Sequence, residues 1–405
     1  MMFTHPRGAS ARVVRLLLAL LGPIGCTDAP SGSYASDDVA SAAGADLPTL
    51  DWSLTEDYRV GGVSASDALA FGDIAVVAFG PDGRLYVIDG DALHVVVIDQ
   101  GGRFVRTLGE PGEGPGSLVW PTGLVVNDDG EVVVLDSARR RWVRFGPEGE
   151  VLDGIALADD APIPRGPLAL DASGRLLGTR DDDVEGTGAR VVLLHAVDPD
   201  ARQEASATVW TAWRPVTPEG RALTAEETGG LTVRLPPLVG FHPDVHAVPL
   251  PDGRFVIADS TNYHLRVVDD EGTVTRRLRR PDVPLTVTEA LRDAERDRRR
   301  LELEADPPAM MVSNAEGQAV GASDDPIVRL ERARIDAMGF HDVVPVVAGL
   351  MVDPDARLWV LRTGETPGAP GPIDVYAVSY THLRAHETAL RISYAVFCLK
   401  KGGGG

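Results

Sequence analysis

Residues 251–278 read PDGRFVIADSTNYHLRVVDDEGTVTRRL, and this stretch contains nearly all of the unit that predicts the fold. Its apolar runs FVIA and LRVV have the length of typical strands, and turn-forming residues border each of them. Asp252-Gly253 suits a hairpin turn because glycine adopts a positive φ without steric cost. We therefore expect each unit to be strand, turn, strand, connector, strand, turn, strand.

The same pattern recurs in four other places along the chain. The copies are PDGRLYVID (81–89), DDGEVVVLD (128–136), ASGRLLGTR (172–180) and PDARLWVLR (354–362). Four-stranded units that repeat every 40 to 50 residues or so are typical of the blades of a β-propeller. Residues 85–88 are continuously apolar, which predicts strands covered on both faces by stacked sheets.

Two stretches allow a family resemblance to be named. ADSTNYHLRVVDDEG (258–272) and IDGDALHVVVIDQGG (88–102) resemble NHL repeats, and residues 51–377 as a whole resemble the six-bladed, TolB-like propeller lipoproteins of bacteria. The resemblance implies an all-β fold of six blades. Because the fifth unit ends at residues 373–377, we expect a ring truncated at the C-terminus. We also expect a strand within residues 52–62 to pair with the last blade.

The glycine-rich run LGEPGEGPGSLVWPTGL (108–124) could be a phosphate-binding loop or a connector between units. It contains no Gly-Lys-Ser/Thr, so it is not a P-loop. Glu110 and Glu113 would also repel a phosphate. Glycine and proline supply the tight bends of a crossing from the outer edge of one blade to the innermost strand of the next. We therefore interpret the run as a connector.

The N-terminus has the pattern of an export signal. Within residues 1–25, arginines precede a short apolar run and small residues, which predicts a signal peptide. The stretch GPIGC resembles a bacterial lipoprotein cleavage box, in which Cys26 would be lipidated. The alternative is an ordinary signal peptide cut nearby. Residues 26–50 then form a flexible tether of small and polar residues.

The C-terminal segment, residues 378–405, resembles a translated sequencing adapter and is expected not to be native. It contains Cys398, so that the expected folded part, residues 51–377, has no cysteine for a disulfide or a thiol nucleophile. The chain carries a net charge of −21. Such an acidic surface disfavours binding to nucleic acid and to anionic lipid.

A long insertion, residues 281–345, separates the fourth and fifth units. It is expected to contain an exposed helix over residues 286–305, with a capping box formed by Thr286 and Glu289, and a second helix over residues 327–338. One interpretation is a solvated decoration of one face. The other is a lid or docking element over the channel mouth, since long insertions in compact repeats are often functional.

Few residues suggest chemistry. His242 and His246 flank Asp244 at a spacing that could place both rings on one side, but no further ligand lies nearby in the sequence and we predict no metal there. We predict no catalytic residue, since there is no Gly-x-Ser-x-Gly motif. The recurring Asp89, Asp136 and Asp259 are expected to cap turns. The basic run at residues 139–141 is expected to contact a connector.

The sequence thus favours a non-catalytic propeller, exported and lipid-anchored in a bacterial cell envelope, on the periplasmic or outer-membrane side. Its expected partner is a protein, peptide or glycan bound at one face of the disc, although no ligand-binding residue can be named. The alternative is a metal-dependent hydrolase or lyase, lactonase-like or NHL-lyase-like. The resemblance to such propellers leaves open a calcium ion in the central channel.

Overall fold

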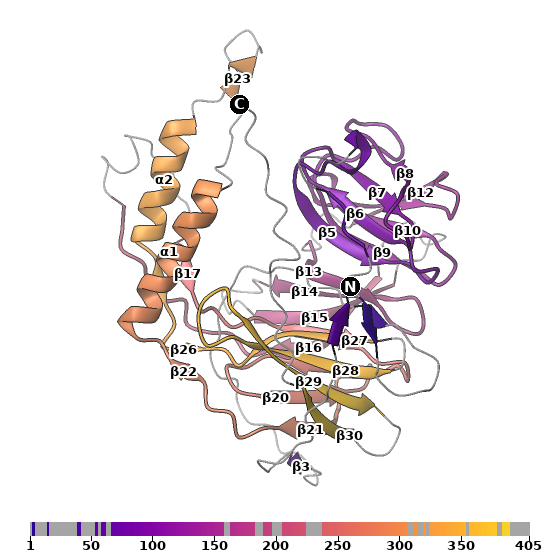
Figure 1. Ribbon diagram of the computed structural model, residues 1–405. Helices are drawn as coiled ribbons and strands as arrows, with labels where there is room; N and C mark the ends of the chain where they lie inside the picture. The colour runs from indigo at the N-terminus through magenta and orange to yellow at the C-terminus, as the bar shows by residue number, and fades with distance from the viewer. Residues whose placement is uncertain are drawn as a thin grey trace.

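The computed structural model describes residues 66–157, 163–182, 189–196, 205–223, 237–305, 324–353 and 356–378, with short segments at 2–4, 14–15, 39–41, 53–55, 58–61, 312–313, 319–320 and 383–388. Most of the predicted signal peptide, tether and adapter-derived tail, including Cys26, lies outside these residues. Within them, short strands predominate (Figure 1).

Five four-stranded antiparallel sheets follow one another along the chain, and each is a meander. The first contains β5 (Ile74–Phe79), β6 (Leu85–Asp89), β7 (His94–Ile98) and β8 (Phe104–Leu108). The second contains β9 (Pro121–Val126), β10 (Val132–Asp136), β11 (Arg141–Phe145) and β12 (Val151–Ala156). The third contains β13 (Arg165–Leu170), β14 (Leu176–Asp182), β15 (Ala189–Ala196) and β16 (Ala205–Ala212).

The last two sheets have the same order. The fourth contains β18 (His246–Pro249), β19 (Phe255–Ala258), β20 (His264–Val268) and β21 (Val274–Arg279), with β3 (Val39–Ser41) added in parallel to its outer edge. The fifth contains β27 (Val347–Val352), β28 (Arg357–Thr363), β29 (Pro370–Val378) and β30 (Leu383–Thr388). These sheets correspond to the five repeated units, and we call them blades one to five.

The blades pack against one another through their apolar faces. Their first strands, β5, β9, β13, β18 and β27, contact one another in that order. Between blades one and two the core contains Tyr86, Ile88, Val134 and Phe145, and between blades four and five it contains Val256, Leu265, Leu358 and Val360. Strand β10 is buried along its whole length. The prediction of strands covered on both faces is therefore confirmed.

The hairpin turns have nearly the same backbone geometry in different blades. Gly83, Gly130 and Gly253 have φ values of 78°, 81° and 84°. In each turn the glycine amide donates to the carbonyl three residues earlier, as from Gly83 to Gly80 over 2.9 Å. The Asp-Gly pairs thus form the predicted turns. In blade five Ala356 occupies the glycine position with a φ of 57°.

The run at residues 108–124 is a connector, as predicted. It leaves β8, the outermost strand of blade one, and enters β9, the innermost strand of blade two. Leu118 is fully buried, and its amide donates to the Glu110 carbonyl over 2.8 Å. Arg141 donates to the Ser117 carbonyl over 2.7 Å. The predicted contact of the basic run at residues 139–141 with a connector is confirmed.

Two expectations concern the ends of the chain. The strand within residues 52–62, β4 (Ser53–Thr55), pairs in the structure with β1 (Met2–Thr4), which also pairs with β2 (Val14–Arg15). Its expected pairing with the last blade of a six-bladed ring stays a prediction, because the structure describes five blades. In blade five, β30 supplies the fourth strand from within the segment that we expect to be adapter-derived, so the truncation of the native blade stays a prediction.

The chain between β21 and β27 contains two helices, α1 (Glu289–Ala305) and α2 (Asp324–Asp336), which lie side by side in Figure 1. Two-stranded pairs flank them: β17 (Val239–Gly240) with β25 (Gly339–Phe340), β22 (Leu285–Thr286) with β26 (Val343–Val344), and β23 (Val312–Ser313) with β24 (Ala319–Val320). Single 3-10 turns lie at η1 (Asp67–Leu69) and η2 (Ser137–Arg139).

Helix α1 begins later than predicted. Thr286 is not its cap, because residues 285–286 pair with β26. The hydroxyl of Thr288 instead accepts from the Leu291 amide, at 3.4 Å. Neither α1 nor α2 combines the length and apolar character of a bilayer-spanning helix, and the part of the chain that the structure describes contains no other α-helix.

Candidate functional site

The recurring aspartates hold the connectors in place. Asp89 is 3% exposed, and its carboxylate accepts from the amides of Gly72, Asp73, Asp91 and Ala92 at 3.0–3.2 Å. This ties the segment before β5 to the end of β6. Four accepted hydrogen bonds leave the carboxylate little capacity for a ligand.

The other two aspartates act in the same way. Asp136 is fully buried and accepts from the Trp120 amide over 3.0 Å, at the entry to β9. Asp259 accepts from the Trp210 indole over 2.9 Å and from the Trp213 amide over 3.3 Å, where a long connector leaves blade three. These contacts support the predicted structural role.

In blade five an arginine stands at this repeat position. Arg362 Nη1 lies 3.2 Å from Asp282, and its Nε lies 3.4 Å from Asp374. Arg280 contacts the same two carboxylates, at 2.9 and 2.8 Å. The four side chains thus form a ring of alternating charge between blades four and five. Asp374 is only 1% exposed, so the ring belongs to the core.

Two buried tyrosines lie beside this ring. The hydroxyls of Tyr263 and Tyr376 are 2.8 Å apart, and both side chains are fully buried. Burial raises the pKa of both phenols above the ordinary value. Neither tyrosine is therefore suited to proton transfer near neutral pH. We interpret the pair as a polar support between the two blades.

His242 and His246, whose spacing could have placed both rings on one side, have different neighbours in the structure. His246 begins β18, and burial lowers its pKa to about 4. His242 follows β17, and its ring neighbour is His341, at 4.9 Å between centroids and an interplanar angle of 85°. Sequence reasoning missed His341 because it lies in another connector. The parallel pairing of β17 with β25 brings the two rings together.

His242 and His341 present an unusual environment. His242 is 5% exposed, and its Nδ1 has no hydrogen-bond partner among the described residues. The same holds for the buried Nε2 of His341. Burial is the main cause that lowers the pKa of both, to about 2 for His242. Both imidazoles are therefore neutral at physiological pH.

An ion pair lies next to the histidines. Arg190, at the start of β15, is 8% exposed and donates to the Pro243 carbonyl over 3.1 Å and to Asp244 over 2.9 Å. Asp244, the residue between the two predicted histidines, is thus engaged by a guanidinium. Its negative charge is balanced there.

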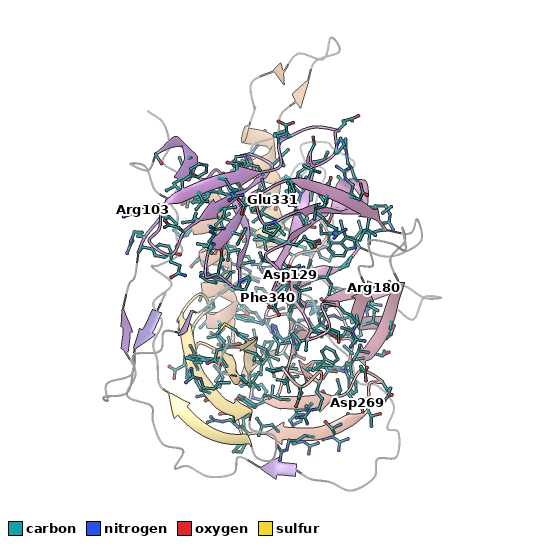
Figure 2. All side chains as sticks on the ribbon, turned by 90° about the vertical axis from the view of Figure 1, so that its right-hand side faces the viewer. Arg103, Asp129, Arg180, Asp269, Glu331 and Phe340 are labelled. Carbon is teal, nitrogen blue, oxygen red and sulfur yellow. The ribbon has the colours of Figure 1, made fainter. Side chains whose placement is uncertain are left out.

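The segment before His242 is strained and packed. Phe241 has a φ of 54°, a left-handed conformation that is rare for a bulky side chain. Its ring lies 6.0 Å from that of Phe340, over which Arg296 of α1 stacks at 4.9 Å. Figure 2 shows Arg103 and Asp269, in turns before outermost strands, toward the margins of the molecule. Arg296 thus places helix α1 in contact with the paired connectors.

Most of the exposed large apolar side chains lie on the segments that join blades. Trp120 is 65% exposed, Val216 72% and Val283 83%. The others in these segments are Val119, Leu285 and Leu301. Only Phe104 and Val151 of this group lie in blade strands, at the starts of β8 and β12.

Within the described ranges, no group of three or more histidine, cysteine, aspartate or glutamate side chains is placed to hold a metal ion. The calcium ion that the family resemblance leaves open for the central channel therefore has no assigned ligands.

Comparisons with known proteins bear on the fold. The family model that matches the chain, at residues 64–167, is described as a 6-bladed beta-propeller. A search of curated proteins found no match. Among solved structures, the chain is similar to a candidate exported protein from Bacteroides fragilis, with 11% identity, a TM-score of 0.40, and coverage of 81% of this chain and 75% of that one.

Two further solved structures have named functions. One is a catalytically inactive virginiamycin B lyase from Staphylococcus aureus with quinupristin, at 12% identity, a TM-score of 0.33, and coverage of 78% and 84%. The other is the calcium-binding protein regucalcin from Agrobacterium tumefaciens, with 13% identity, a TM-score of 0.36, and coverage of 80% of this chain and 77% of that one. These likenesses concern the fold alone. The chain has an all-β propeller fold, of which the structure describes five blades.

Proposed function

We propose that this protein is an exported, envelope-anchored β-propeller that binds a protein, peptide or glycan ligand at the face formed by its inter-blade connectors. The observation that carries the proposal is the concentration of exposed apolar side chains on those connectors and on α1. Contiguous or clustered exposed apolar residues on a folded protein often mark an interaction site.

Hydrogen bonds also hold the connector that carries Trp120. The residue is 65% exposed, while its amide donates to the buried Asp136 and its carbonyl accepts from the Ser137 amide. Loops held by a rigid scaffold commonly carry binding residues. Tryptophan is also enriched among the residues that dominate binding energy. Trp120 is therefore our first candidate for a ligand contact.

The test uses peptide and glycan arrays probed with the purified protein and with Trp120→Ala. We expect the variant to lose at least tenfold in affinity for the ligands that the wild type binds, since truncated central aromatics cost about 2 kcal/mol or more. Phe104→Ala is the matched control, because Phe104 is 41% exposed but lies on a blade strand. Equal losses in both variants, or unchanged binding by Trp120→Ala, would contradict the proposal.

The envelope anchor is tested separately at Cys26. Cells that express the natural gene are fed a labelled fatty acid, and we expect the label to appear in the wild-type protein and to be absent from Cys26→Ser. An unlabelled wild-type protein would remove the lipid anchor but leave the binding face untouched.

A further inference from the structure

We propose that His242 and His341 form a binding site for a divalent transition-metal ion, with His242 Nδ1 and His341 Nε2 as its two protein ligands. The proposal does not depend on the proposed function. It assigns a role to two connectors that converge without an evident reason in the sequence.

The first argument is the unmet hydrogen bonding. Buried polar atoms in folded proteins nearly always have a partner, and a buried nitrogen without one costs free energy. The two nitrogens belong to rings whose centroids are 4.9 Å apart, and His242 is 5% exposed. A group that binds both nitrogens at once removes both costs.

The second argument is the separation of the rings. Zinc binds imidazole nitrogen at about 2.0–2.1 Å, so a ring centre lies about 3.2 Å from the metal. At a tetrahedral angle, two such ring centres are then about 5 Å apart. The observed centroid distance is 4.9 Å, and the interplanar angle of 85° keeps the rings from colliding. The two rings therefore already have the spacing of a pair of ligands.

The third argument is the charge of the surrounding groups. Arg190 lies nearby, but it forms an ion pair with Asp244 at 2.9 Å. The carboxylate of Asp342, next to His341 in the sequence, adds negative charge near that ring. These two carboxylates offset the positive charge of Arg190 around the proposed site.

The fourth argument is the backbone. The left-handed φ of Phe241 positions the residue that directly follows it, His242. Strained backbone persists where the surrounding structure holds it, and it is common at binding sites. Since His242 and His341 belong to different connectors, a bound ion would cross-link them. Two protein ligands leave other positions to water, so we expect weaker binding than at a site with three or four.

The test is a titration of the metal-stripped full chain with Co²⁺, followed by visible absorption and by calorimetry. We expect the wild type to show the absorption bands of a tetrahedral cobalt site, and His242→Gln and His341→Gln each to lower the affinity for Co²⁺ at least tenfold. His264→Gln is the control, because His264 is half-buried in a blade strand and should leave binding unchanged. Binding that survives the double variant His242→Gln/His341→Gln would belong to another part of the chain and would overturn the proposal.

A second measurement covers the case in which the variants do not fold, as judged by circular dichroism. Crystals of the wild type soaked in Zn²⁺ and measured at the zinc absorption edge should show an anomalous peak between the two rings. An ordered water molecule at that place, with no anomalous signal, would show that a buried water satisfies the nitrogens and would overturn the metal site.

Discussion

At the scale of single residues, the hairpin turns offer a test of backbone conformation. Ala356 holds a φ of 57° in the turn of blade five, where other blades use glycine. A left-handed conformation costs a non-glycine residue about 1–2 kcal/mol, while glycine loses more entropy on folding. We expect Ala356→Gly to raise the free energy of unfolding by about 0.5–1 kcal/mol, measured by urea denaturation.

The reverse change provides the control. Gly253 has a φ of 84°, and an added Cβ would meet no atom within 4 Å. Gly253→Ala should therefore lower the free energy of unfolding through the backbone alone, by about 1 kcal/mol. If the two substitutions shift stability in the same direction, the turn geometry is not the cause.

The buried His246 makes the stability of the protein depend on pH. Its pKa falls from 6.5 to about 4 on folding, mainly because of burial and also because of the positive charge of Arg190, against an opposing hydrogen bond with Val347. The unfolded chain therefore binds the proton more tightly, and stability is lost as pH falls from about 6.5 to 4. The loss from this residue is about 3 kcal/mol.

The measurement is the free energy of unfolding at a series of pH values for the wild type and His246→Gln. We expect the difference between them to shrink or reverse toward pH 4, since glutamine does not titrate. Parallel pH profiles for the two proteins would show that His246 is not protonated on unfolding.

At the scale of elements, the charged ring joins two strands of blade five, β28 and β29, to the connector that follows blade four. Asp374 balances Arg280 and Arg362, and its replacement leaves two largely buried guanidinium groups with only Asp282. Removing one member of a buried ion pair costs about 3–5 kcal/mol. We expect Asp374→Asn to lower the free energy of unfolding by about 3 kcal/mol, measured by chemical denaturation.

An exposed ion pair serves as the comparison. Glu148 is paired with Arg106 at 3.3 Å, but its side chain is 85% exposed. Exposed pairs contribute little, so Glu148→Gln should not change stability measurably. A similar small effect from Asp374→Asn would mean that water reaches the ring.

At the scale of the whole molecule, the parts that could be predicted from the sequence are those that local residues determine. The Asp-Gly turns and the buried runs are specified within a few residues, so blades one to five follow from the repeat. The role of Asp89 follows from its recurrence.

Other parts depend on distant segments and could not be predicted. Strand β17 has two residues, and such a short sequence pattern does not predict its pairing with β25. His341 was therefore missed as the neighbour of His242. Thr286 was expected to start the helix, but residues 285–286 pair with β26 instead. Helix α1 therefore begins at Glu289. The pairing of β4 with β1 likewise depends on residues near the start of the chain.

The meander also separates the two ends of every inner strand. In blade four, His246 pairs with Ala258 at one end of β18, while Pro249 pairs with Phe255 next to the turn at the other end. A fluorophore or surface linker attached at residues 251–253 would therefore sit at the opposite end of the strand from the connectors. Immobilised in this way on a sensor chip, the protein would present its connectors to the flowing solution.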